Sequence, residues 1–380
     1  MTQSITLCGK YLAPGGHLET GCVTVEGAQI SQTAAAGSST LPLPPGAVIL
    51  PGFIDLQING AFGMDVTDDP TPAVQTLSRR LPERGVVAFL PTVVTSPVGG
   101  YPAMLAAVDL TPAPNGAVPL GLHLEGPFIN IERKGAHNPA YICPPTPENV
   151  RRLINPEKVR IISLAPEMPG GLDAIRAIRA AGIIPATAHS MATYQQACEA
   201  FAAGAGYGIH LFNAMPPLHH REPGLIGALL EPSAPPFGII PDGVHLHRAV
   251  MGLIFRSRGV EGITLVSDAM AAAGLGMGNH KLGDREIIVD ETSARLHDGT
   301  LAGSIILSDD AVRNMVRFGI CDLPSAARMV SETPARVLGM DDRKGKIAPG
   351  YDADLVVLDE NLQVYMTIIG GEIAYRRESI

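Results

Sequence analysis

Three short apolar runs in the sequence each end at a side chain that can bind a metal ion. GLHLEG contains Glu125, IIPATAHS contains His189 and YGIHLFN contains His210. One carboxylate with two imidazoles is a ligand set of catalytic zinc, where three protein ligands leave the fourth position open for water. Such a site lowers the pKa of bound water from about 15.7 towards 7, which permits hydrolysis at neutral pH. Each residue taken alone fits an ordinary strand end, so the prediction depends on all three together.

Other polar residues could complete a hydrolytic site. Asp268, in ITLVSDA, could accept a proton from water and deliver it to a leaving amine; the alternative is that it caps a helix over Ser267–Ala273. His137, in the loop RKGAHNPA, could donate to a carbonyl oxygen as negative charge develops, unless it is merely solvated. His123 is predicted to be a hydrogen-bonded core residue, because it shares an inward face with Glu125.

The elements that must position these residues alternate between strand and helix. This alternation predicts a (β/α)8 barrel, whose active site lies at the carboxyl ends of its strands. A doubly wound open sheet is the competing architecture, but no glycine-rich phosphate fingerprint follows the first strand. The eight predicted strands are Val48–Gln57, Val86–Val94, Val118–Glu125, Val159–Ala165, Ile183–His189, Gly206–Phe212, Phe237–Pro241 and Ile263–Ser267.

The two ends of the chain have a different pattern. Residues 1–47 and 344–380 contain short strand-like segments, and we expect them to form one small β-sandwich beside a barrel of residues 48–343. Within the barrel, helices are predicted over Leu172–Ala181 and, with Ser190 as N-cap, over Ala192–Ala203.

Composition excludes several functions. The net charge is −9 and no basic run occurs, so neither nucleic acid nor an anionic membrane is an expected partner. No apolar run reaches the length of a membrane helix and no signal peptide is evident, which predicts a cytoplasmic protein. The cysteines are odd in number and lack CxxC spacing, so we expect no disulfide framework and a reducing compartment: Cys8, Cys22, Cys143, Cys198 and Cys321.

Longer motifs resemble one known family. PGFIDLQING, GLHLEGPFIN followed by RKGAHNP, LAPE, HLFNAMPP with REPG, IIPDGVH, VSDA and LAGS resemble, in order, the N-acetylglucosamine-6-phosphate deacetylases of the amidohydrolase superfamily. The resemblance implies that Glu125, His189 and His210 bind the metal, that Asp268 is the acid/base and that His137 polarises the acetamide carbonyl. It also implies that His245 and Arg221 contact the phosphate of the substrate, and that the protein is a homodimer in which Arg221 reaches the neighbouring site. Further substrate contacts implied are Ala136, Asn213, Ala214, His245, Leu301, Ala302 and Gly303.

One departure from the superfamily pattern concerns the first strand. Many amidohydrolases have His-X-His there for a second metal, whereas this chain has Gln57-Ile58-Asn59. Neutral amides are weak ligands compared with imidazole, so we expect a single divalent metal, with Gln57 and Asn59 orienting water or substrate. Zinc is the first expectation, and iron, cobalt or manganese suit the same ligands. The expected reaction is deacetylation of N-acetylglucosamine 6-phosphate; the alternatives are another amidohydrolase substrate or a non-catalytic scaffold.

Overall fold

One part of the fold is a parallel sheet curled into a nearly closed barrel. The computed structural model describes residues 4–34, 37, 40–282, 285–290, 293–297, 299, 301 and 303–378. The sheet order is β15-β14-β13-β12-β11-β10-β8-β5, and a bridge from Ile58 to Ala269 brings its two edges together. Its strands are β5 (Phe53–Ile58), β8 (Val86–Val94), β10 (Leu122–Glu125), β11 (Val159–Leu164), β12 (Ile184–Thr187), β13 (Tyr207–Gly208), β14 (Phe237–Ile239) and β15 (Ile263–Leu265), with β9 (Val118–Pro119) beside β8.

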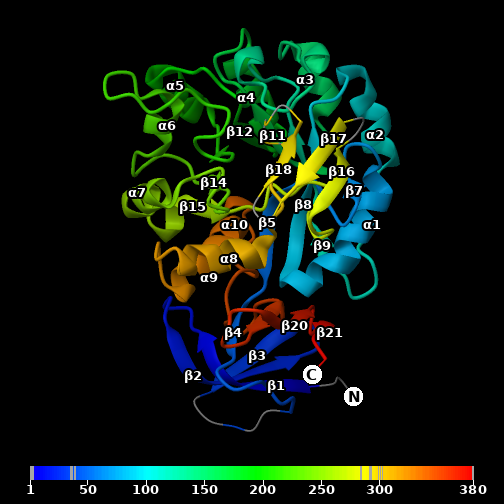
Figure 1. Cartoon of the computed structure of the whole chain (residues 1–380), viewed down its shortest axis with the longest axis vertical. Coiled ribbons are helices and arrows are strands. Elements are labelled where there is room, and N and C mark those ends of the chain that lie inside the picture. The colour runs from blue at the N-terminus through cyan, green and yellow to red at the C-terminus, as the bar shows by residue number, and fades with distance from the viewer. Residues whose placement is uncertain are drawn as a thin grey trace.

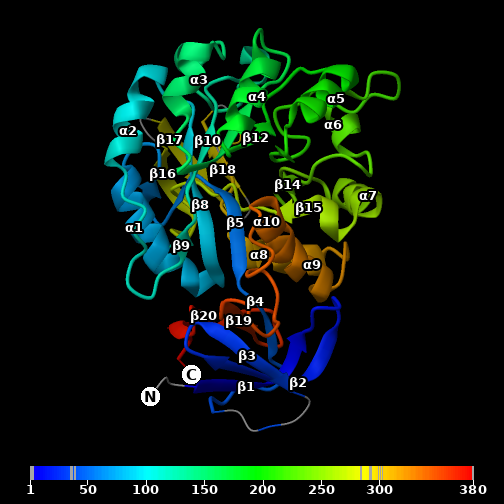
Figure 2. The ribbon, with the colours of Figure 1, turned by 180° about the vertical axis from the view of Figure 1, so that it is seen from behind.

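Helices surround this sheet, as Figures 1 and 2 show from opposite sides. They are α1 (Pro70–Arg80), α2 (Tyr101–Ala107), α3 (Pro147–Leu153), α4 (Gly171–Ala180), α5 (Tyr194–Ala203), α6 (Gly224–Leu229), α7 (Arg248–Arg258), α8 (Ser308–Arg317), α9 (Leu323–Val330) and α10 (Glu332–Val337). Short 3₁₀ turns lie at Leu81–Arg84, Val98–Gly100, Ile131–Arg133, Pro139–Tyr141 and Val260–Gly262. The (β/α)8 barrel and the order of its eight strands are confirmed.

Helix α5 shows how local residues set an element. It begins at Tyr194, because the Thr193 side chain accepts from the Gln196 amide and the Gln196 side chain accepts from the Thr193 amide. The prediction of Ser190 as N-cap is therefore wrong. Ser190 lies earlier in the loop and donates to Glu167 at 2.7 Å.

Strands from both termini form a second sheet below the barrel, blue and red in Figure 1. The predicted strand Val48–Gln57 is divided, since Val48–Pro51 joins this sheet and Phe53–Ile58 joins the barrel. The terminal sheet has an apolar core of its own, in which Leu7, Val23 and Ile49 are fully buried. The sheet order is β21 (Glu372–Arg376), β20 (Val364–Ile369), β19 (Leu355–Leu358), β4 (Val48–Pro51), β1 (Ser4–Leu12), β2 (Leu18–Glu26) and β3 (Gln29–Ala34).

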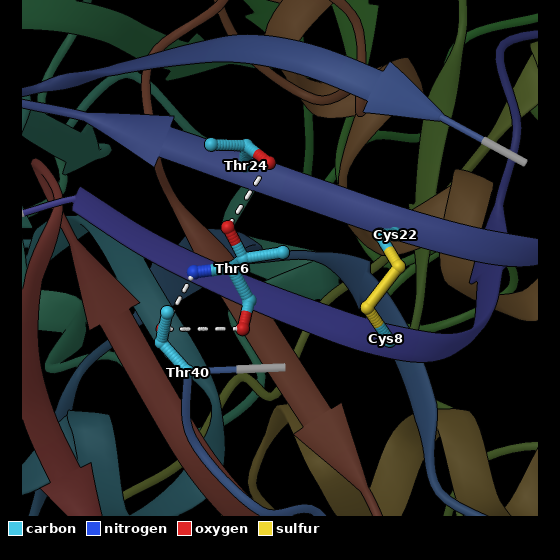
Figure 3. Close-up of a disulfide and its surroundings, with 5 residues drawn as sticks. All are labelled: Thr6, Cys8, Cys22, Thr24 and Thr40. Atoms are coloured by element: carbon cyan, nitrogen blue, oxygen red, sulfur yellow. Dashed lines mark hydrogen bonds between the residues drawn. A yellow bond between two sulfur atoms is a disulfide. The ribbon is translucent and has the colours of Figure 1, made fainter. Parts of the chain in front are cut away.

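A disulfide joins β1 to β2 in this sheet. Cys8 and Cys22 are directly opposite in the antiparallel register, with their Cα atoms 4.0 Å apart (Figure 3). Next along the same strands, the hydroxyls of Thr6 and Thr24 lie 3.2 Å apart. The expectation of no disulfide is therefore wrong, because pairing across a hairpin depends on register rather than on a short cysteine motif. Cysteine usage no longer supports a reducing compartment, and the cytoplasmic location stays a prediction.

The segment after β15 contains an antiparallel sheet that the sequence did not reveal, drawn in yellow in Figure 1. It consists of β16 (Gly278–Leu282), β17 (Arg285–Val289) and β18 (Ala294–Leu296). A smaller hairpin, β6 (Gly60–Ala61) with β7 (Met64–Asp65), follows β5. Across the part of the chain that the structure describes, every helix is too short or too polar to cross a membrane.

Candidate metal centre

Glu125, His189 and His210 meet at the carboxyl ends of the barrel strands. Glu125 ends β10, and the two histidines lie two residues beyond the ends of β12 and β13. The Nε2 atoms of His189 and His210 lie 3.1 Å and 3.0 Å from Glu125 Oε1. All three side chains are buried, and their ligand atoms lie within 4.8 Å of one another. The predicted cluster is thus assembled from three strands that are far apart in sequence.

The hydrogen bonds around this cluster suit a cation. His189 Nδ1 donates to the carbonyl oxygen of Arg133 at 2.8 Å, so the Nε2 of a neutral His189 presents a lone pair to the Glu125 carboxylate. Two acceptors that face each other need either a proton or a cation between them. His210 Nδ1 is buried and has no hydrogen-bond partner among the described residues. Imidazole nitrogens and a carboxylate oxygen in this arrangement fit a divalent metal ion.

The charges in the cluster influence one another. Burial would raise the pKa of Glu125, but its contacts with the imidazoles of His189 and His210 outweigh burial and hold that pKa well below its usual range. Burial would lower the pKa of His210, yet Glu125 raises it, with a further contribution from Asp268. The site therefore favours an ionised carboxylate, which is the form that binds a metal.

Three residues of the site have a left-handed backbone. The φ angles are 43° at His189, 26° at His210 and 46° at Asp268. A non-glycine residue in this region costs about 1–3 kcal/mol, and such residues cluster at functional sites. Backbone hydrogen bonds support the conformation; for example, the Asn130 amide donates to the His189 carbonyl at 2.9 Å.

Asp268 is partly exposed next to the cluster. Its Oδ1 accepts hydrogen bonds from the side-chain amides of Gln57, at 3.0 Å, and Asn59, at 2.7 Å. Burial and then the negative charge of Glu125 raise the pKa of Asp268 to about 7. Residues 267–273 form no helix, so the alternative of an N-cap is wrong. A carboxyl group whose pKa lies near neutrality suits a proton carrier.

His137 is buried against the same cluster. Its ring contacts the His189 ring edge to face, with centroids 4.5 Å apart, and its Nε2 lies 3.9 Å from Glu125 Oε1. The backbone amide of Thr95 donates to Nδ1 at 3.3 Å, which leaves the proton of a neutral ring on Nε2, the nitrogen nearer the cluster. Burial and the charge of His189 lower the pKa of His137 to about 3, so the ring is neutral.

The predicted anion-binding residues have different surroundings. His245 Nδ1 lies 2.5 Å from Asp242 Oδ2, a contact that fixes the ring. Arg221 is exposed and its Nη1 lies 2.9 Å from His220 Nε2; no contact joins Arg221 to His245 among the described residues.

The remaining predicted substrate contacts lie on surrounding loops. Asn213 and Ala214 lie in the turn that follows His210, and the Asn213 side chain donates to the His210 carbonyl at 3.2 Å. Ala136 is exposed, and Gly303, which has a φ of 122°, packs near Met270. Leu301 pairs with Arg295 of β18, while Ala302 lies outside the described residues.

Two supporting residues escaped the sequence analysis. Glu167 accepts from the Met191 amide at 2.6 Å and from Asn130 Nδ2 at 2.9 Å, and so fixes the loop that carries His189. Thr95 lies one residue beyond β8 and contacts His137. Both follow strands, so the rule that polar residues at strand ends are functional candidates would have found them. His123 is confirmed as a core residue, with Nε2 2.6 Å from Ser163 Oγ.

A barrel with two histidines and a glutamate at its strand ends defines a class of metal-dependent hydrolases. The model of the amidohydrolase family matches residues 48–374. N-acetylglucosamine-6-phosphate deacetylase from Bos taurus is 40% identical, over 88% of this chain and 85% of its own length. N-acetylgalactosamine-6-phosphate deacetylase from Escherichia coli O157:H7 is 37% identical, over 86% of this chain and 88% of its own length.

A solved structure resembles the whole chain. It is that of a mutant N-acetyl-D-glucosamine-6-phosphate deacetylase from Mycobacterium smegmatis in complex with N-acetyl-D-glucosamine 6-phosphate. It is 32% identical, covers 98% of this chain and 99% of its own, and has a TM-score of 0.85. The chain therefore belongs to the amidohydrolase family, in its branch of N-acetylglucosamine-6-phosphate deacetylases.

Proposed function

We propose that this enzyme hydrolyses the acetamide of N-acetyl-D-glucosamine 6-phosphate to D-glucosamine 6-phosphate and acetate. The observation that carries the proposal is the meeting of the Glu125, His189 and His210 cluster with Asp268 and His137 at one end of the barrel. Family membership and the relatives' names supply the substrate. A non-catalytic scaffold is not favoured, because it has no need for this set of buried polar side chains.

The residues divide the chemistry among them. A divalent ion held by Glu125, His189 and His210 would polarise the amide carbonyl and acidify water. His137, neutral and with its proton on Nε2, donates to the carbonyl oxygen as negative charge develops there. Asp268 accepts the proton of the attacking water and delivers it to the departing nitrogen. This transfer releases the amine in a protonated form, which is a far better leaving group than the amide anion.

We infer zinc as the metal, one ion per chain, from the donor set of two imidazoles and one carboxylate. Iron, cobalt and manganese are the alternatives for the same ligands. The Gln57 and Asn59 amides at the first strand argue against a tightly bound second ion, since neutral amide oxygens are weak ligands.

The phosphate of the substrate is assigned to His245 and to Arg221 of a neighbouring subunit. Asp242 fixes the His245 ring through Nδ1, which leaves Nε2 free to donate to a phosphate oxygen. Arg221 is exposed, as a residue that reaches another protomer must be, and its planar guanidinium suits two phosphate oxygens. This assignment requires a homodimer. Ala136, Asn213, Ala214, Leu301, Ala302 and Gly303 are assigned to the sugar pocket.

We also propose that residues 48–343 form the catalytic domain and that residues 1–47 and 344–380 form a small β domain. The separate apolar core of the terminal sheet supports this division. Strand β4 shifts the boundary slightly, because Val48–Pro51 pairs with the terminal strands β1 and β19.

A second candidate substrate is the galactose epimer, because a relative of comparable identity is named for it. The test is acetate release by purified protein from N-acetylglucosamine 6-phosphate, N-acetylgalactosamine 6-phosphate and unphosphorylated N-acetylglucosamine. Chelation and metal replacement are included as further arms. We expect fast release from the first substrate only, lost on chelation and restored by metal. Faster release from the galactose epimer would select the second candidate, and no release from any sugar under any metal condition would reject both.

A further inference from the structure

We infer that Gln57 and Asn59 are positioning residues that hold Asp268 for proton transfer by donating two hydrogen bonds to one of its oxygens. The inference rests on the proposed function, in which Asp268 is the proton carrier. It assigns these two residues a role other than that of second-metal ligands or substrate contacts.

Both amides reach the same atom. Gln57 Nε2 lies 3.0 Å and Asn59 Nδ2 lies 2.7 Å from Asp268 Oδ1. The two residues are two apart at the end of β5, so their side chains share one face of the strand. Gln57 is fully buried, and its amide therefore has little freedom to move away.

The backbone around these side chains is equally constrained. The Asp268 amide donates to the Gln57 carbonyl at 2.8 Å, and the Asn59 amide donates to the Ala269 carbonyl at 2.8 Å. Ser267 Oγ also donates to the Gln57 carbonyl, at 3.3 Å. These bonds close the barrel between its first and last strands. The two amide donors and Asp268 consequently belong to one rigid seam.

This arrangement makes the two oxygens of Asp268 unequal. An amide nitrogen donates and cannot accept, so Oδ1 receives two N–H groups and a proton is disfavoured there. The proton that Asp268 takes from water is thus directed to Oδ2. Rotating either amide would bring an acceptor oxygen against Oδ1, a repulsive contact with the ionised carboxylate. The orientation of both amides is therefore set by Asp268.

The amide oxygens reveal a cost of the arrangement. Gln57 Oε1 and Asn59 Oδ1 are buried and have no hydrogen-bond partner in the described part of the chain. A buried acceptor without a partner costs about 1–3 kcal/mol. The two amides thus leave their oxygens without hydrogen bonds while their nitrogens donate to Asp268. This pattern is expected if holding Asp268 is the role of both side chains.

The experiment replaces Asn59, which makes the shorter bond. In Asn59→Leu we expect kcat for acetate release to fall about tenfold to a hundredfold, because a hydrogen bond to a charged group is lost, while KM stays within about twofold. Bound metal per chain should not change. The surface variant Gln75→Met, which alters a side-chain amide that contacts only Thr111, is the matched control and should keep wild-type kinetics.

A double mutant tests whether Asn59 acts through Asp268. In an Asp268→Asn background, Asn59→Leu should change the residual rate by less than about twofold, since the group it positions is already gone. An equal loss in both backgrounds would overturn the inference. So would a raised KM with unchanged kcat, which indicates a substrate contact, or a loss of bound metal, which indicates a ligand.

Two further measurements cover the remaining outcomes. Asn59→Asp keeps the shape of the side chain but has no amide donor, so it decides the kinetic result if Asn59→Leu does not fold. Crystal structures of wild type and variant are independent of turnover: we expect Asp268 to leave its wild-type position in the variant, and an unmoved Asp268 would overturn the inference. If wild-type protein releases no acetate, the proposed function fails. The crystal structures alone then decide whether Gln57 and Asn59 hold Asp268 in position.

Discussion

Thr95 gives the most direct test of how His137 is oriented. Thr95 is buried one residue beyond β8, and its hydroxyl oxygen lies 2.7 Å from His137 Nδ1. Its backbone amide donates to the same nitrogen at 3.3 Å. Because this N–H faces Nδ1, a proton on Nδ1 would set two donors against each other. Thr95 therefore keeps the proton of the neutral ring on Nε2, the nitrogen that we propose donates to the substrate carbonyl.

Thr95→Val keeps the branched shape and the backbone amide but removes the hydroxyl. The loss of one neutral hydrogen bond is worth about 0.5–1.5 kcal/mol, which corresponds to a factor of about 2 to 13 in rate. We expect kcat/KM for acetate release to fall by that factor. His137→Ala, which removes the donor itself, should cost about a hundredfold or more, by analogy with loss of one donor to a developing oxyanion.

Thr95→Ser is the matched control, since it retains the hydroxyl and should keep at least half of the wild-type rate. Metal content must be measured for each variant, because the backbone carbonyl of Glu125, 3.2 Å from Thr95 Oγ1, is a second acceptor for the same hydroxyl proton. Equal rates for the Val and Ser variants would refute a role of the hydroxyl in orienting His137. A full Thr95→Val effect that persists in a His137→Ala background would refute it as well.

Four other predictions follow from charged groups. Asp268→Asn should bind the sugar phosphate in calorimetry while kcat falls by about 10²-fold or more, and a near-normal rate would remove its assigned role. Asp268 must be ionised to accept a proton, so wild-type kcat/KM should fall as the pH drops through its pKa. Burial and the charge of Glu125 raise that pKa to about 7 without a metal, and a cation that offsets this charge should move the fall in kcat/KM to a lower pH. Arg221→Ala should raise KM more than it lowers kcat; unchanged affinity would exclude Arg221 from the phosphate site. Burial raises the pKa of Asp55 from 3.8 to about 6, a cost of about 3 kcal/mol to the charged form. A raised pKa gives stability at low pH that is lost as the pH rises through about 6. The free energy of unfolding in urea should therefore rise for Asp55→Asn relative to wild type, by up to about 3 kcal/mol, as the pH is raised from about 4 to about 8. Curves of unfolding free energy against pH that run parallel for the two proteins would contradict this prediction.

The sequence predicted the barrel and the meeting of Glu125, His189 and His210 because both depend on local patterns. Apolar runs of strand length are readable one at a time, and parallel strands bring their carboxyl ends to one side of the fold. Glu125, His189 and His210 could therefore be placed together before any contact was known. The cluster itself, with its Nε2 atoms at 3.1 Å and 3.0 Å from Glu125, agrees with that placement.

Features that depend on pairing between distant segments could not be predicted in this way. The disulfide depends on the register that sets Cys8 opposite Cys22, and no local motif encodes it. The β16–β18 sheet depends on antiparallel pairing of three short strands, none of which was predicted. Ser190 resembles a helix cap by residue type, but the reciprocal bonds of Thr193 and Gln196 decide where α5 begins. In each case the residue types allowed the observed pairing or helix start. Contacts with other residues decided which of the allowed structures formed.

In the proposed mechanism, metal binding and proton transfer are linked through Glu125. The charge of Glu125 raises the pKa of Asp268 towards 7, so a cation that offsets this charge would lower the pKa and favour the ionised base. Linkage requires the converse: ionisation of Asp268 must strengthen cation binding by the same free energy. The amides of Gln57 and Asn59 add two donors to the ionised form without adding charge. Imidazoles at these positions would instead bind a second cation and lower the pKa of Asp268 much further. Under the proposed function, the Gln-X-Asn pair thus keeps Asp268 basic enough to return its proton to the departing nitrogen.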